Sequence, residues 1–211
     1  MNKRYTSERE DFIRPLAEQG LADAQFSLGE MFEKGIDGVP EDGKEAVFWY
    51  EKAASQGHVE AQYALGWLYY DGELVPENPK QALHWYSLAA KQGHAMAMLG
   101  LGVLYEQGDA IEQDLEKAAG YYQKAAESNL SMAQFWLGRM YEKGSGIPKD
   151  PVKAAYWYRR AAENEDDDAQ VALARCFEQG QGVEQNMHTA MEWYTKAAKL
   201  DNAIAKTKLG L

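Results

Sequence analysis

One segment has the spacing of a phosphate-binding loop. Gly38-Val-Pro-Glu-Asp-Gly43-Lys44-Glu45 fits Gly-x4-Gly-Lys but lacks the final Ser or Thr. Such a loop needs free backbone N–H groups for the phosphates and a hydroxyl for Mg²⁺. Here Pro40 has no N–H, Glu45 replaces the hydroxyl residue, and the neighbouring carboxylates would repel phosphate. We therefore interpret the segment as a connecting loop and expect no nucleotide cofactor.

The histidines and the cysteine predict neither a metal site nor a nucleophile. His58 and His94 each follow a glycine, which is typical of turns. His84 and His188 lack acidic or cysteine partners at ligand spacing. Cys176 falls where other copies of a repeat, described below, carry Met or Leu, so it is expected to fill the core. We expect no metal and no catalytic thiol.

Carboxylates and serines give no catalytic pattern either. The acidic run Glu163-Asn-Glu-Asp-Asp-Asp168 lacks the alternating arrangement of a calcium loop, so it predicts a solvated turn before a helix. Acylation by a serine of the penicillin-binding type would need Ser-x-x-Lys, Ser-Asp-Asn and Lys-Thr-Gly, and none occurs. The nearest match is Lys206-Thr-Lys208. The protein is therefore predicted not to be an enzyme.

The chain repeats itself every 36 residues, and this period indicates a solenoid of stacked units. An alanine opens each unit, Leu-Gly follows, then an aromatic residue and a closing glycine. The opening alanines are Ala24, Ala61, Ala97, Ala133, Ala169 and Ala205.

Each unit is expected to form two antiparallel helices. The first carries apolar residues at helical spacing, as at Leu65, Leu68 and Tyr69, and ends at a glycine. The second begins after a residue that caps helices well, and Glu45 and Gln81 are predicted to complete capping boxes. The expected N-caps are Asp42, Asn78, Asp114, Asp150 and Asn186.

The domain layout follows from the period. Residues 1–23 are expected to form an N-terminal tail and capping helix, and residues 205–211 a partial C-terminal capping helix. Five repeats lie between them, at 24–60, 61–96, 97–132, 133–168 and 169–204. The predicted fold is all-α, with about eleven helices and no sheet.

Composition limits the partners and the location. Lys and Arg total 22 against 33 Asp and Glu, giving a net charge of −11. This balance disfavours nucleic acid and anionic membranes and favours a basic or neutral protein partner. No stretch is long and apolar enough to span a membrane, and the single cysteine does not argue for an oxidising compartment. The cytoplasm is expected, or the periplasm if a signal peptide has been removed.

The combined pattern resembles the Sel1-like repeat family, relatives of the tetratricopeptide repeat with a longer loop between the helices. It reads Ala-x-x-x-Leu-Gly-x-x-Tyr-x-x-Gly, then a loop, then Asp/Asn, Lys-Ala, Trp-Tyr and Ala-Ala, over about residues 12–211. The resemblance implies a right-handed α-superhelix that acts as an adaptor or scaffold for proteins. The alternative is an exported, envelope-associated member with hydrolase or penicillin-binding activity, although the single Cys176 departs from the cysteine-rich exported branch.

The resemblance also implies where a partner binds. In tetratricopeptide-like stacks the first helices line a concave groove, and four positions around the Leu-Gly glycine point into it. The groove residues expected here are Phe26, Glu30, Glu33, Tyr63, Trp67, Tyr70, Asp71, Leu99, Glu106, Phe135, Arg139, Glu142, Arg175 and Glu178.

Two features of this set point beyond the fold itself: a row of glutamates, and the aromatic residues Tyr63, Trp67 and Tyr70. They predict that the partner is a peptide or protein segment with basic and apolar side chains. They give no prediction of the oligomeric state. A plainer reading also stands, in which the aromatic positions are partly packing residues and Arg139–Glu142 and Arg175–Glu178 are exposed pairs on one helix.

Overall fold

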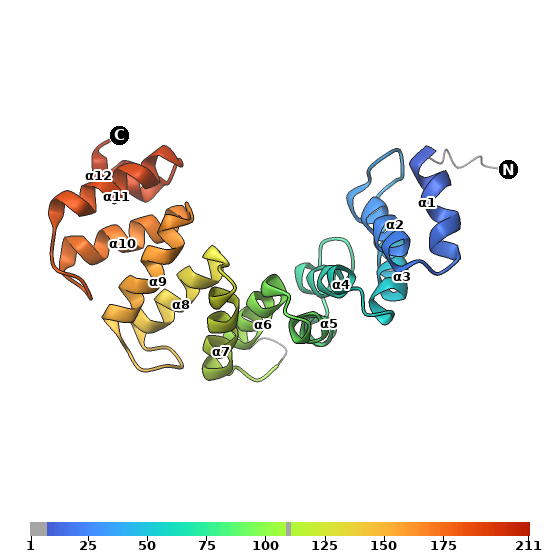
Figure 1. The fold of residues 1–211 in the computed structure, drawn as a ribbon, viewed down its shortest axis with the longest axis horizontal. Helices are drawn as coiled ribbons and strands as arrows, with labels where there is room; N and C mark the ends of the chain where they lie inside the picture. Colours follow the sequence, from blue (N-terminus) through green and yellow to red (C-terminus); the bar gives the residue numbers. More distant parts are fainter. Residues whose placement is uncertain (1–7, 109–110) are drawn as a thin grey trace. The chain divides into compact units, whose positions relative to one another are not determined.

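The computed structural model describes residues 8–108 and 111–211, which form twelve α-helices and no strand (Figure 1). The predicted all-α fold is confirmed, and the expected count of about eleven helices is one short. None of the described helices is long and apolar enough to cross a bilayer. The chain divides into two compact units, Met1–Leu104 with Asp109–Ile111, and Tyr105–Gly108 with Glu112–Leu211. We call them unit 1 and unit 2.

Unit 1 is built from successive helices that pack on their neighbours. They are α1 (Glu8–Glu18), α2 (Ala22–Lys34), α3 (Gly43–Ser55), α4 (Val59–Asp71), α5 (Pro79–Lys91) and, up to Leu104, α6 (Ala95–Gln107). Helix α1 packs on α2, α2 on α3, α3 on α4, and α4 on α5.

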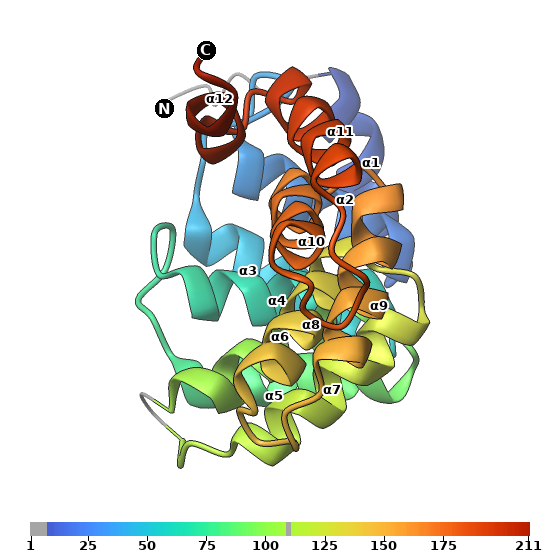
Figure 2. The same cartoon turned by 90° about the vertical axis from the view of Figure 1, so that its left-hand side faces the viewer.

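Unit 2 follows the same plan, as the neighbouring helices α10 and α11 show in both ribbon views (Figures 1 and 2). Its helices are α7 (Leu115–Glu127), α8 (Ser131–Lys143), α9 (Pro151–Glu163), α10 (Asp167–Gln179), α11 (Met187–Lys199) and α12 (Ala203–Leu209). Each contacts the next in the chain. The short α12 packs on α11 and buries Ala205.

All five predicted N-caps are present at the starts of α3, α5, α7, α9 and α11. In α3, for example, the Asp42 carboxylate accepts the backbone N–H groups of Lys44 and Glu45. The predicted capping boxes are wrong. The backbone N–H of Asp42 donates to the carbonyl of Phe32 in the preceding helix, and the Glu45 carboxylate accepts the indole N–H of Trp49 instead.

The N–H of the N-cap residue closes the loop between the two helices of every repeat. Asn78 donates to Tyr69, Asp114 to Tyr105, Asp150 to Tyr141 and Asn186 to Phe177, each at 2.8 or 2.9 Å. The donor that a capping box would use is therefore already taken by the tertiary structure.

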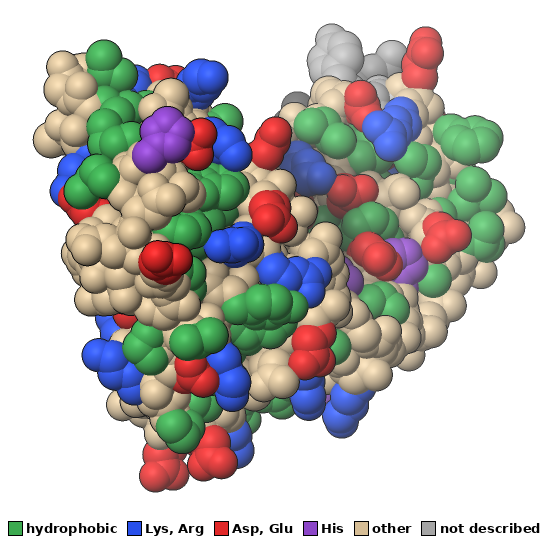
Figure 3. Space-filling model, turned by 60° about the vertical axis from the view of Figure 1, so that its left-hand side comes forward, with side chains coloured by type: hydrophobic (Ala, Val, Ile, Leu, Met, Phe, Trp, Pro, Cys, Tyr) green, Lys and Arg blue, Asp and Glu red, His purple; other side chains and the backbone are tan. Residues whose placement is uncertain are grey.

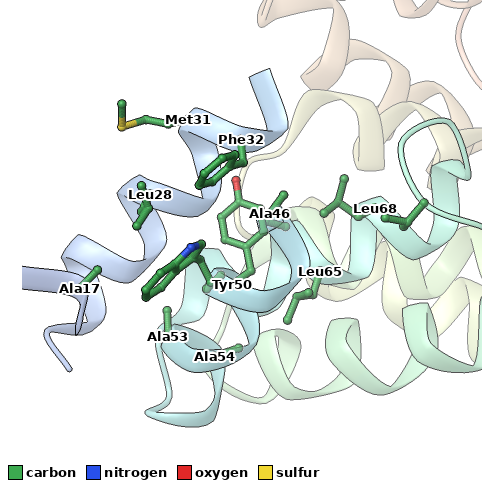
Figure 4. Close-up of a cluster of buried hydrophobic side chains, with 14 of the residues drawn as sticks. Ala17, Leu28, Met31, Phe32, Ala46, Tyr50, Ala53, Ala54, Leu65 and Leu68 are labelled. Carbon is green, nitrogen blue, oxygen red and sulfur yellow. The ribbon is translucent and has the colours of Figure 1, made fainter. Parts of the chain in front are cut away.

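The core of each repeat is a buried tyrosine from the second helix. Tyr50 points from α3 toward α2, among Leu28, Phe32 and Leu65 (Figure 4). The Leu-Gly glycine makes room for the ring, because a Cβ on Gly29 would lie 2.6 Å from Tyr50 Cδ1. The five tyrosines are Tyr50, Tyr86, Tyr122, Tyr158 and Tyr194.

The segments that had suggested chemistry are structural. The phosphate-loop-like segment connects α2 to α3, and the 300 Å³ cavity beside it is lined by the carboxylates of Glu10, Asp42 and Glu45, which would repel phosphate. Cys176 is buried in the core of unit 2, and burial raises its pKa to about 11. In the acidic run, Asp166 caps α10 by accepting the N–H of Ala169 at 2.8 Å.

Candidate protein-binding surface

The predicted groove positions lie on the first helices, and each unit presents its own set. We call the positions on α2, α4 and the start of α6 the unit 1 stripe, and those on the end of α6, α8 and α10 the unit 2 stripe. The face drawn in Figure 3 mixes acidic, basic and hydrophobic side chains, so no single type of side chain dominates it.

Two aromatic residues of the unit 1 stripe orient the following repeat. Phe26 stacks on His58 with ring centres 4.7 Å apart, and Tyr63 stacks on His94 at 4.6 Å. Both histidines cap helices, since Nδ1 of each accepts a backbone N–H, from Ala61 and Ala97 respectively, at 3.2 Å. Burial lowers the pKa of His94, which favours the neutral ring that accepts this bond. The sequence placed these histidines in turns without indicating that they act as caps.

Trp67 and Tyr70 form the exposed aromatic part of the unit 1 stripe. Trp67 is 42 % exposed, and its ring lies 6.0 Å from the half-buried ring of Tyr70. Asp71, next along α4, is exposed. The other repeats have glutamate, valine or arginine at the position of Trp67. Exposure of a large ring here is therefore a property of this one repeat.

Leu99 must be removed from the predicted groove. It is only 5 % exposed, so it belongs to the core of its repeat. The same repeat position holds the half-buried Phe26, Tyr63 and Phe135 in other units, and local packing decides how much of each side chain stays accessible.

The glutamate row has a structural role that the sequence analysis missed. The hydroxyl of Tyr50 donates to Glu33, that of Tyr122 to Glu106 at 2.6 Å, that of Tyr158 to Glu142 at 2.7 Å and that of Tyr194 to Glu178 at 2.8 Å. In the second repeat Tyr70 stands where the others have glutamate. The row therefore anchors the buried tyrosines, and the idea that the fold does not explain it is wrong.

These contacts make the tyrosines difficult to ionise. Burial is the main cause of the raised pKa of Tyr50, Tyr158 and Tyr194, and the bond to the glutamate raises it further. A phenolate would lose its solvation and face a carboxylate at hydrogen-bonding distance.

In the unit 2 stripe the protein supplies its own cations. The Arg139 guanidinium lies 4.5 Å from the centre of the Trp136 ring, and Arg175 Nη2 lies 3.9 Å from Glu142 Oε1. Lys208 Nζ binds Glu178 Oε1 at 2.7 Å, which with the Tyr194 hydroxyl lowers the pKa of Glu178. The two arginines thus make other contacts than the pairs expected within one helix. Arg139 lies over the rings of Trp136 and Phe135, and Arg175 pairs with a glutamate of the preceding repeat.

A ladder of buried glutamines ties the turns between repeats to the first helices. Each donates its side-chain amide to a carbonyl near the end of the preceding helix: Gln25 to Ala17, Gln62 to Ala54, Gln134 to Ala126 and Gln170 to Ala162. Their recurrence at one repeat position was the signal that could have identified them.

A site among the described side chains would either hold a metal ion or contact a ligand directly. Among them, no three or more His, Cys, Asp or Glu residues come together in a way that could hold a metal ion. In the unit 1 stripe Trp67 and Asp71 are exposed and Tyr70 is half-buried. Ring faces and carboxylates bind cationic and apolar side chains.

Comparison with known proteins finds the same repeat in a family model and in solved structures. The Sel1 repeat model matches five times, at residues 22–58, 59–94, 95–130, 131–166 and 167–202. Each match starts two residues before the repeat predicted from its opening alanine, at the residue where the first helix of the repeat begins.

Two solved structures share the fold. One is described as a protective antigen of uropathogenic Escherichia coli strains displaying an SLR fold, and is 36 % identical with a TM-score of 0.91 over 95 % of this chain. The other, a Sel1 repeat protein from Oxalobacter formigenes, is 38 % identical with a TM-score of 0.77 over 89 % of this chain. This chain covers 43 % and 75 % of those proteins. A curated relative, chitin synthase regulatory factor 3 of Schizosaccharomyces pombe, is 39 % identical over 57 residues, only 6 % of its length.

Proposed function

Because the chain belongs to the Sel1 repeat family, whose repeats generally mediate protein–protein interactions, we propose that it is a non-enzymatic scaffold that binds a protein segment on its first helices. The exposed Trp67 beside Tyr70 is the observation that carries this proposal. Aromatic residues dominate binding hot spots, and burying such a ring in a partner stabilises a complex without a cost to the fold.

The bound segment carries basic and apolar side chains. In unit 2 the position of Trp67 holds Arg139 and Arg175, which bind a tryptophan ring and a glutamate of the protein itself. In unit 1 the corresponding stripe has rings and the exposed Asp71 but no arginine. Its lysine, Lys34, pairs with Glu30 on its own helix at 2.6 Å, leaving no cation beside Trp67 among the described residues of the stripe. A partner that supplies the missing cation makes the same kinds of contact, and the net charge of −11 attracts it.

The other predicted residues contribute unequally. The four row glutamates accept hydrogen bonds from buried tyrosines, so only their remaining lone pairs are available to a partner. They are Glu33, Glu106, Glu142 and Glu178. Phe26 and Tyr63 are half-buried by their histidines, so they shape the surface beneath a ligand. We therefore assign the main contacts to Trp67, Tyr70 and Asp71.

Affinity capture from the protein's own cells, followed by mass spectrometry, identifies the partner. The variant Trp67→Ala/Tyr70→Ala should then bind it about 30-fold more weakly or worse, the loss of a hot spot worth about 2 kcal/mol. The control is Phe48→Ala/Tyr156→Ala, which removes two exposed rings on the second helices α3 and α9.

The control should retain full affinity, and both variants should keep the helical circular dichroism spectrum. Wild-type affinity in the Trp67→Ala/Tyr70→Ala variant for every captured partner would refute the assignment.

A further inference from the structure

We call each glutamine of the ladder, with its hydrogen-bond partners, a rung. One rung lacks a hydrogen-bond donor. Gln170 is 3 % exposed, and its Nε2 donates to the Ala162 carbonyl, but its buried Oε1 has no hydrogen-bond partner. In the other three rungs the same oxygen accepts a bond. A buried acceptor without a donor destabilises the fold, so a ligand that supplies the donor gains affinity there.

The missing donor can be identified from the repeat. At the end of the second helix, Gln56 donates to Gln25 at 2.7 Å and Gln92 to Gln62 at 2.9 Å, and Asn164 lies 3.4 Å from Gln134 in the same arrangement. The corresponding residue of the last repeat is Leu200, which has no donor and is 45 % exposed. In every complete rung the donor is a side-chain carboxamide.

An open cavity of about 390 Å³ lies at this rung. Gln170 and Leu200 line it together with Trp193, from α11, and Glu165, from the turn before α10. The ammonium of Lys196, another lining residue, lies 3.8 Å from the centre of the Trp193 ring. The site therefore has room for a side chain, an apolar wall and a buried acceptor.

We propose that this cavity binds the carboxamide side chain of an asparagine or glutamine from a partner protein. The second rung shows the geometry, because Gln92 Nε2 donates both to Gln62 Oε1 and to the carbonyl of Gly57 at 3.1 Å. In the last repeat the equivalent acceptors are Gln170 Oε1 and the backbone of Glu165. The two N–H donors of one carboxamide satisfy both.

The charges of the cavity select a neutral donor. Two lysines, Lys196 and Lys199, and two glutamates, Glu163 and Glu165, line the cavity. Their formal charges cancel, so the cavity gives no net electrostatic attraction to a cation or an anion. The lysines repel an ammonium or guanidinium and can donate to the carboxamide oxygen. The site is separate from the Trp67 surface and does not rest on the function proposed for it.

The test uses the ¹⁵N-labelled full chain and two small probes followed by NMR. N-acetyl-glutamine methylamide carries the carboxamide, and N-acetyl-methionine methylamide has the same backbone amides with an apolar side chain of similar length. We expect the glutamine probe alone to shift the side-chain amide signals of Gln170 and the backbone signals of Glu165 and Leu200. Leu200→Gln should abolish these shifts, because the new side chain completes the rung from within.

Leu200→Met is the matched control, since it keeps an apolar residue and should leave binding of the glutamine probe unchanged. Circular dichroism establishes that both variants are folded. Equal shifts with the two probes, no shift with either, or full binding by folded Leu200→Gln would each overturn the proposal. Trp67→Ala/Tyr70→Ala should bind the glutamine probe as the wild type does, so the two sites are tested separately.

Discussion

At the scale of single residues, several positions that look available for binding are engaged by the fold. Each row glutamate accepts a hydrogen bond from the hydroxyl of a buried tyrosine, so one of its carboxylate oxygens is already engaged. Trp67 differs because 42 % of it is exposed, although its ring also contacts that of Tyr70. Exposure is therefore the property that distinguishes Trp67 from the row glutamates.

The buried tyrosines predict a loss of stability at high pH. Burial raises the pKa of Tyr50, Tyr86 and Tyr158 in the folded chain, whereas the unfolded value is near 10. Above pH 10 the folded state therefore holds protons that the unfolded state releases. The free energy of unfolding should be steady below pH 10 and then fall by up to about 1.4 kcal/mol per pH unit for each such tyrosine.

Urea unfolding followed by circular dichroism between pH 8 and pH 11.5 measures this slope. Tyr158→Phe should reduce it, while Tyr156→Phe, at an exposed ring on the same helix, should leave it unchanged. A free energy of unfolding that stays constant up to pH 11.5 would contradict this account of the core.

At the scale of elements, the Leu-Gly glycine and the tyrosine are one packing unit. The ring of Tyr86 lies between Gly66 of α4 and Gly100 of α6, where an added Cβ would come within 2.3 and 2.6 Å of it. The first helix of one repeat and that of the next thus approach the same ring closely. Because both helices pack against one ring, the ring fixes the position of one repeat relative to the next.

Gly66→Ala should destabilise the protein by about 1–3 kcal/mol, because the new methyl group overlaps a ring held on both sides. Gly120→Ala is the control, since Gly120 is an exposed helical glycine with nothing near its Cβ direction. It should stabilise the protein by up to about 1 kcal/mol through helix propensity. Urea unfolding of both variants measures the effects, and equal stabilities would rule out close packing at the tyrosine.

The elements were more predictable from the sequence than the contacts between them. The caps at Asp42 and its equivalents act within a few residues, so their identity is enough to place a helix start. The capping box at Glu45 failed because its donor bonds a residue in another helix. Leu99 and the glutamate row failed for the same reason, since burial and tyrosine contacts depend on neighbouring helices.

At the scale of the whole molecule, one repeated frame carries residues that vary from unit to unit. The alanines, the tyrosine, the Leu-Gly pair and the caps recur because each unit must bury the same surfaces against its neighbours. The position of Trp67 is free to vary, and the five repeats use glutamate, tryptophan, valine and arginine there. This position can therefore change without disturbing the packing that recurs in every repeat, as the proposed scaffold function requires.

Site-specific photo-crosslinking tests the central claim, that a partner binds the exposed first-helix surface of unit 1. Benzoylphenylalanine replaces Trp67 in one variant and Phe48, an exposed ring on α3 in the same unit, in the other. After irradiation in the protein's own cells, the variant at position 67 should yield discrete covalent adducts with a partner, and the variant at position 48 should not. Adducts at position 48 with none at position 67 would contradict the account.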